Sequence, residues 1–205
     1  MNQIVIPFII LGYVIQLIEL VFYPLPSDFT TYNIIQKQNV GLTKSKPVIA
    51  ILILGTIISV VTFLIPGLLI LFPEGTSLLH YMKININSFG YIAVFLIIGG
   101  SLITLIGVLK ISYSERSKKE STLIQTGIFR ITRNPITLGL NTVVIGFLLA
   151  LPSIEMLAGC IIYVLNGHFR VRMEEKQLEQ IYGKAFQNYR QSVSRYMNLK
   201  PVLGL

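Results

Sequence analysis

The chain has 205 residues, of which 53% are hydrophobic and 13% are charged, with a mean hydropathy of +0.69 and a formal net charge of +8. Soluble domains carry about 25% charged residues, so an ordinary soluble domain is excluded. Basic residues that gather on one face of a membrane explain the positive charge without a nucleic-acid partner. The single cysteine, Cys160, excludes an intrachain disulfide and a cysteine-based metal cluster.

Apolar residues come in blocks about as long as a membrane-spanning helix, roughly 17–25 residues. We predict an all-α, multi-pass membrane protein with about five spans, at 4–22, 48–72, 89–109, 135–151 and 153–169. The last two are short and form a hairpin (135–169) that is broken at Pro152–Ser153. The second helix of this hairpin is expected to continue past the membrane.

The basic residues define the expected topology. With five spans, every Lys and Arg except Lys83 falls on one side of the membrane. The positive-inside rule then places the N-terminus outside and the C-terminal segment in the cytoplasm. We divide the chain into spans 1 to 3 with their connectors (1–109) and a region of cytoplasmic loop, hairpin and C-terminal helices (110–205).

Small and helix-breaking residues mark features inside the spans. Pro66-Gly67 should kink or end the outer turn of the second span. The third span carries a set of small residues that allow neighbouring helices to approach closely, namely Gly99, Gly100, Ser101 and Gly107.

Two polar motifs stand at the two feet of the hairpin. The first reads Thr126-Gly-Ile-Phe-Arg-Ile-Thr-Arg-Asn-Pro-Ile-Thr-Leu-Gly139, and the second reads Arg170-Val-Arg-Met-Glu-Glu-Lys-Gln-Leu-Glu-Gln-Ile-Tyr-Gly183. If both helices span, Arg133 and Glu174 return to the same face of the bilayer. The Asn134-Pro135 helix start offers free backbone N–H groups to an anion, or a simple N-cap by Asn134. Arg170 and Glu174, one turn apart, form either an ordinary ion pair or a site for a zwitterionic cofactor.

The C-terminal segment carries an aromatic stripe. Gly183 is expected to end a helix at Tyr182. Apolar side chains then recur at helical spacing, in the order Tyr182, Phe186, Tyr189, Val193 and Tyr196. This pattern fits a core face, a helix lying on the headgroup layer, or a helix folded over the site as a lid.

Several familiar catalytic patterns are missing from the chain. It has no P-loop, no glycine-rich dinucleotide turn, no His-Glu-x-x-His and no paired cysteines. By the predicted topology His80 and His168 lie on opposite sides, so no metal site is expected. Transport is less supported, because spans 2 to 4 contain no ionisable side chain.

With these two motifs, the chain resembles the isoprenylcysteine carboxyl methyltransferase and phospholipid methyltransferase superfamily of integral membrane enzymes. The family pattern Arg-His-Pro-x-Tyr-x-Gly reads here Arg133-Asn134-Pro135-Ile-Thr137-Leu-Gly139, and the Arg-x-x-x-Glu-Glu segment follows after the hairpin. The resemblance covers about 120–200. The family's His and Tyr are replaced by Asn134 and Thr137, which leaves the acceptor more open than the cofactor.

The resemblance implies S-adenosylmethionine as cofactor and a lipophilic acceptor, small or prenylated, most directly an isoprenylcysteine-type carboxylate. It assigns the catalytic roles to Arg170, which would orient the acceptor carboxylate, and to Glu174, which would hold the cofactor. The implied cofactor-binding set is Thr122, Leu123, Ile124, Phe129, Asn134, Pro135, Ile136, Thr137, Glu174 and Glu175. Faces of Phe129 and Tyr182 would stabilise the sulfonium cation.

Three alternatives remain open. One is a phospholipid amine, or another small lipophile, as acceptor. Another is an NADPH-dependent reductase of the sterol type, although this chain has no tryptophan and carries Met-Glu-Glu where such enzymes have a His-Arg-x-x-Arg-Asp-Glu-like stretch. The third is a non-catalytic membrane protein. The expected location is a membrane (cell membrane in a microbe, endoplasmic reticulum in a eukaryote) with the site facing the cytoplasm.

Overall fold

A computed structural model describes residues 46–71, 86–116 and 123–197, together with positions 7, 10–12 and 14. Within these residues all regular secondary structure is helical. Most of the predicted first span, 4–22, therefore lies outside the described residues, and so does Thr122.

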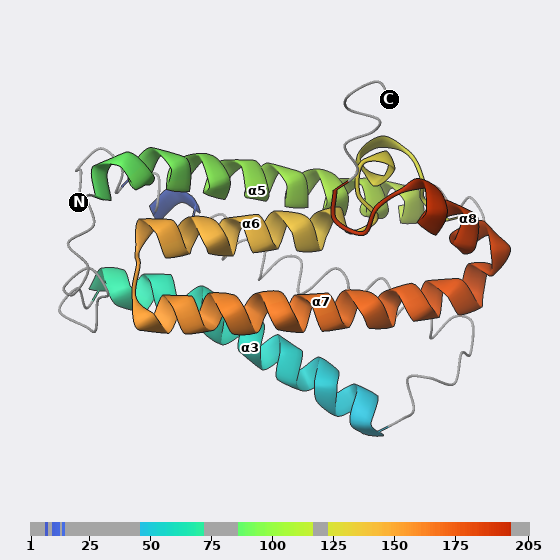
Figure 1. The fold of residues 1–205 in the computed structure, drawn as a ribbon, viewed down its shortest axis with the longest axis horizontal. Helices are drawn as coiled ribbons and strands as arrows, with labels where there is room; N and C mark the ends of the chain where they lie inside the picture. The colour runs from blue at the N-terminus through green and yellow to red at the C-terminus, as the bar shows by residue number, and fades with distance from the viewer. Residues whose placement is uncertain are drawn as a thin grey trace.

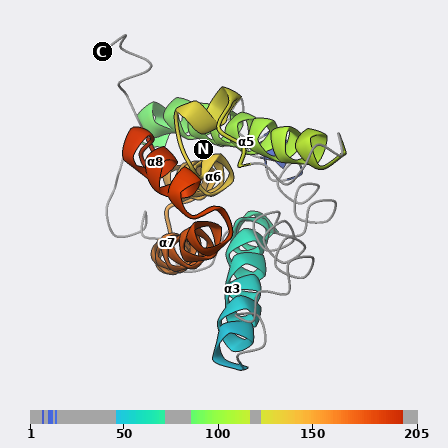
Figure 2. The same ribbon diagram turned by 90° about the vertical axis from the view of Figure 1, so that its right-hand side faces the viewer.

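In the part of the chain that the structure describes, four long helices form the bundle: α3 (Lys46–Leu71), α5 (Ile86–Arg116), α6 (Pro135–Ala150) and α7 (Ile154–Tyr182). A short 3-10 helix, η2 (Gly127–Arg130), precedes α6, and α8 (Lys184–Ser192) follows α7. Figure 1 shows α6 between α5 and α7 along the length of the bundle, with α3 on the far side of α7. Viewed from the end, α8 crosses the end of the bundle at which α6 begins (Figure 2).

Helix boundaries follow the signals in the sequence. The hairpin turns at Pro152–Ser153, where the Ser153 hydroxyl accepts a hydrogen bond from the Met156 amide at 3.0 Å and so caps α7. As predicted, α7 continues well past the apolar block, and it ends at Gly183, whose φ of +52° suits glycine. α3 does not end at Pro66 but continues to Leu71. α5 extends to Arg116, beyond the predicted end at residue 109.

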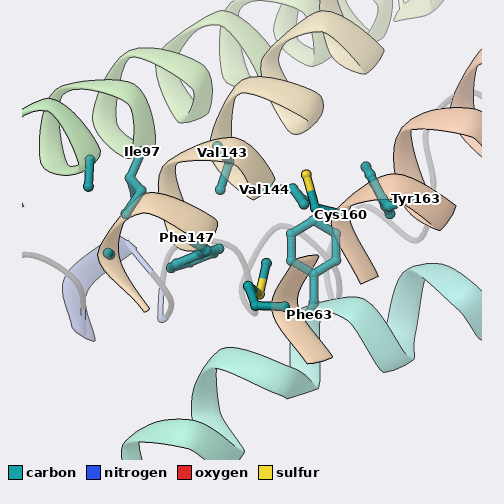
Figure 3. Packing of buried hydrophobic residues seen from close by; sticks show 10 residues of the cluster. Phe63, Ile97, Val143, Val144, Phe147, Cys160 and Tyr163 are labelled. Carbon is teal, nitrogen blue, oxygen red and sulfur yellow. The ribbon is translucent and has the colours of Figure 1, made fainter. Parts of the chain in front are cut away.

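The core lies where α6 packs between its neighbours. Phe147, Val143 and Ile97 are fully buried there, and the rings of Phe63 and Tyr163 meet edge to face at 5.4 Å (Figure 3). The outward faces are also apolar, as the exposed side chains Leu64, Phe95, Leu102, Ile161 and Leu165 illustrate. A bundle that is apolar inside and outside suits a lipid environment rather than water.

By length and composition, two helices of the described part can cross a membrane, within Phe89–Ile111 and Ile154–Tyr182. Shorter apolar helical stretches occur at Val60–Leu69 and Pro135–Ala150. The all-helical class and the apolar helices agree with the sequence, whereas the count of five spans, the topology and the division at 109/110 stay predictions.

The closest helix contact joins α5 to α6 through glycine. A Cβ built on Gly139 would clash with the Thr104 hydroxyl and lie 2.5 Å from the Gly100 carbonyl oxygen. A Cβ built on Gly107 would lie 2.9 Å from Ile136 Cγ1 and 3.2 Å from Pro135 Cγ, so glycine also allows the start of α6 to pack closely here. Gly99, by contrast, has no atom within 4 Å of such a Cβ. The close-packing role predicted for the small residues therefore applies to Gly100 and Gly107 but not to Gly99.

We expect Gly139→Ala to lower the free energy of unfolding by about 2–3 kcal/mol, because the new methyl group meets backbone atoms that cannot move aside. Gly99→Ala is the matched control, since the same change in open space removes only the helix penalty of glycine, about 1 kcal/mol. Thermal unfolding in micelles measures both. Equal melting temperatures for the two variants would contradict the assigned contact.

Candidate active site at the C-terminal end of the bundle

The loop before α6 is held in shape by short-range bonds. Gly127, at φ +67°, opens η2, and the Thr132 amide donates to the Ile128 carbonyl at 3.1 Å. Pro135 is the first residue of α6, where its missing N–H costs no hydrogen bond. Asn134 occupies the N-cap position, but its side chain makes no capping bond, so the interpretation of Asn134 as a simple side-chain cap is wrong.

The side chain of Asn134 instead contacts the segment after α8. We call residues 193–197 the closing segment. Asn134 Nδ2 donates to the Arg195 carbonyl oxygen at 3.1 Å, as does the Thr132 hydroxyl at the same distance. The Arg133 amide donates to the Ser194 carbonyl, also at 3.1 Å. Three consecutive residues of the loop thereby hold the closing segment against the start of α6.

Glu175 is the centre of a buried ionic cluster under the closing segment. Its carboxylate accepts from Arg195 Nε and Nη2, the latter at 2.7 Å, and Arg133 Nη1 lies 3.1 Å from its Oε1. The side chains of Glu175 and Arg133 are each only 8% exposed, and Arg195 is 31% exposed. Two guanidinium groups thus share one carboxylate, and the cluster keeps an excess positive charge.

The environment changes the acidity of both arginines in opposite directions. Burial lowers the pKa of Arg133, although the nearby Glu175 carboxylate opposes this shift. The side-chain hydrogen bond to Glu175 raises the pKa of Arg195. Both groups stay protonated at neutral pH, because a guanidinium group does not lose its proton in proteins. Glu175 therefore faces two positively charged guanidinium groups.

The aromatic stripe is divided by the turn at Gly183 and forms a small separate core. Phe186, Tyr189 and Val193 are buried against Leu123 and Leu178, with Tyr182 partly buried beside them. The Tyr189 hydroxyl donates to the Phe129 carbonyl at 2.6 Å, and burial raises the pKa of Tyr189 far above its usual range, so it stays a donor. Of the three interpretations of the stripe, the core face is the one that this packing supports, and the role of a lid over the site stays a prediction.

Tyr196 belongs to a different contact. Its hydroxyl lies 2.9 Å from His168 Nδ1 on α7, and burial raises the pKa of Tyr196. This pair extends the contact of the closing segment along α7 by two turns beyond Glu175.

The remaining predicted site residues lie around the same end of the bundle. Leu123 packs in the small core, Phe129, Pro135 and Ile136 are buried, and Ile124, Thr137 and Glu174 are partly exposed. Arg170 is buried, 7% exposed, on the same face of α7 as Glu174. Asn134 Nδ2 donates to Glu175 Oε1 at 3.5 Å. Both side chains also bond to Arg195, so their recorded partners are residues of this protein. The cofactor roles of the whole set stay predictions.

Four residues of this end received no role from the sequence. Arg195 donates to the Glu175 carboxylate, and Tyr189, which the sequence identifies only as a residue of the aromatic stripe, donates to the Phe129 carbonyl. Asn141 and Gly167 were not singled out, and they face each other between α6 and α7. A polar residue inside an apolar block was the available signal for Asn141.

Fold and site together define an all-helical bundle with apolar outer faces and a basic, internally bonded end. Residues 86–185, just under half of the chain, match the family model of the phospholipid methyltransferases, and the match begins at the first residue of α5. This match agrees with the resemblance to integral membrane methyltransferases that the two motifs indicate. No curated protein and no solved structure gives a match.

Proposed function

We propose that this protein transfers a methyl group from S-adenosylmethionine to a lipophilic acceptor at the cytoplasmic face of a membrane. The observation that carries the proposal is the family match over 86–185, which includes α5, η2, α6, α7 and the start of α8 but not the closing segment. The apolar outer faces of the bundle give a lipid acceptor a route to this end.

The residues at this end fit the methionine moiety of the cofactor, which carries an ammonium and a carboxylate. Arg133 Nε is buried and has no hydrogen-bond partner within the described part of the chain. The first turn of α6 lacks a side-chain cap. Both features offer N–H donors to a carboxylate. The carboxylate of Glu174, which lies about 100° around α7 from Glu175, would accept hydrogen bonds from the ammonium.

S-adenosylmethionine, when bound, would supply a methyl group from its sulfonium sulfur, and the leaving group would be the neutral thioether. The protein contributes position and exclusion of water. Gly107 and Pro135 fix the start of α6 against α5, while the closing segment and α8 cover the loop before α6. The faces of Phe129 and Tyr182 would stabilise the cation.

For the acceptor we favour the amine of a phospholipid headgroup, on the ground of the matching family's description. A second candidate is the carboxylate of an isoprenylcysteine-type lipid, which the buried guanidinium of Arg170 favours. Arg170→Ala should lower turnover of the anionic acceptor more than that of the amine. Equal turnover in wild type and Arg170→Ala with the anionic acceptor would exclude that role for Arg170.

Binding of S-adenosylhomocysteine to the purified protein, followed by calorimetry, tests the proposed cofactor. We expect micromolar affinity, about −8 kcal/mol, and no binding of NADPH. Thermal unfolding with each ligand is an independent measurement, because a ligand that binds only the folded state raises the melting temperature. Stabilisation by NADPH would support the reductase alternative, and folded protein that binds neither ligand would support a non-catalytic role.

A further inference from the structure

Asn141 and Gly167 face each other between α6 and α7, deeper in the bundle than the ionic cluster. A Cβ built on Gly167 would lie 3.5 Å from Thr137 Cγ2 and 3.7 Å from Asn141 Oδ1. These are ordinary van der Waals distances, so the glycine leaves a gap about as large as one methyl group. The wall of the gap is polar on the side of Asn141.

The Asn141 carboxamide has one unsatisfied atom, its oxygen. Its Oδ1 is buried and has no hydrogen-bond partner among the residues that the structure describes. A buried acceptor without a donor costs about 1–3 kcal/mol. Asn141 lies within an otherwise mostly apolar helix, where a leucine of similar size would avoid this cost. A donor from outside the chain would remove the penalty.

The position of the gap relates it to the proposed site. Asn141 is six residues into α6, about 9 Å along the helix from Pro135. Gly167, Arg170 and Glu174 share one face of α7. The gap therefore continues the line of Glu174 and Arg170 away from the ionic cluster and toward the apolar middle of the bundle, the side from which a lipid would approach.

We propose that Asn141, in the gap opened by Gly167, binds the polar head of the methyl acceptor by accepting a hydrogen bond from its N–H or O–H group. The proposal rests on the proposed function and adds a specificity-determining residue to it. A carboxylate without a proton cannot donate this bond, whereas a lipid amine can.

The test uses full-length protein in nanodiscs of phosphatidylcholine, whose quaternary ammonium has no N–H, with and without phosphatidylethanolamine. We expect phosphatidylethanolamine to raise the melting temperature of the wild type and not that of Asn141→Leu, while S-adenosylhomocysteine binds both with equal affinity. In turnover, Asn141→Leu should raise KM for phosphatidylethanolamine about tenfold. The proposal is overturned by an equal lipid response in both proteins, by no response in the wild type, or by selective loss of S-adenosylhomocysteine affinity in the variant, which would assign Asn141 to the cofactor.

Gly167→Ala tests the gap independently of the amide. The new methyl group makes only ordinary contacts, so this variant should fold at least as stably as the wild type and yet lose the phosphatidylethanolamine response. Gly99→Ala, the same change on open α5 surface, should keep the response. A retained response in Gly167→Ala would overturn the proposal. Failure of the proposed function would appear separately, as no S-adenosylhomocysteine binding in any of these proteins.

Discussion

Glu175→Gln should destabilise the folded protein by about 3–5 kcal/mol, the cost typical of removing one partner from a buried ion pair. The Arg133 guanidinium is 8% exposed and would be left without its carboxylate. A glutamine side chain keeps the shape of glutamate, but it has no charge and only one acceptor oxygen. Arg195 would lose its paired bonds as well, and the closing segment would keep only its neutral contacts with the loop before α6, with His168 and with the small core.

Chemical unfolding in micelles measures this loss, and limited trypsin digestion locates it. Lys184 and Arg190 lie in α8 and are exposed, so early cleavage there would report opening of this end. Glu179→Gln is the matched control, because Glu179 pairs with the exposed Arg190 at 3.5 Å and such surface pairs contribute about 0–1 kcal/mol. If both variants unfold at the same denaturant concentration, the ionic cluster does not hold the end closed.

The helices were largely predictable because their signals are local. Apolar blocks of spanning length indicated α3, α5, α6 and α7, and the Pro152–Ser153 break and Gly183 marked two of their ends. A helix end depends on the few residues that cap it, and those residues are contiguous in sequence. Pro66 misled only in part, since a helix can continue through a proline when its neighbours satisfy the freed carbonyl.

The contacts between distant residues were not predictable from spacing. Helical periodicity places Glu174 and Glu175 about 100° apart, but it does not say which of them faces Arg133. The choice depends on how α7 is rotated against the loop before α6, and on where the chain returns after Gly183. The same reason separates Gly100, which meets Gly139, from Gly99, which meets nothing. The sequence could name the polar residues at this end but not pair them.

Glu174→Ala is expected to weaken S-adenosylhomocysteine binding about hundredfold, enough to remove the signal in calorimetry. A carboxylate that accepts from an ammonium contributes about 1.5–3 kcal/mol, and each 1.4 kcal/mol is tenfold in affinity. Glu174 is partly exposed whereas Glu175 is buried, so the free energy of unfolding should fall by less than in Glu175→Gln.

The two neighbouring glutamates therefore give opposite expectations, and measuring both variants separates binding from folding. Lys176→Ala, an exposed change one residue further along α7, is the control that should alter neither quantity. Wild-type affinity in Glu174→Ala would exclude Glu174 as the cofactor ligand. A different result, in which Glu175→Gln lost the cofactor but kept its stability, would mean that the ionic cluster opens to bind the ligand. The closing segment would then control access to the site rather than cover it permanently.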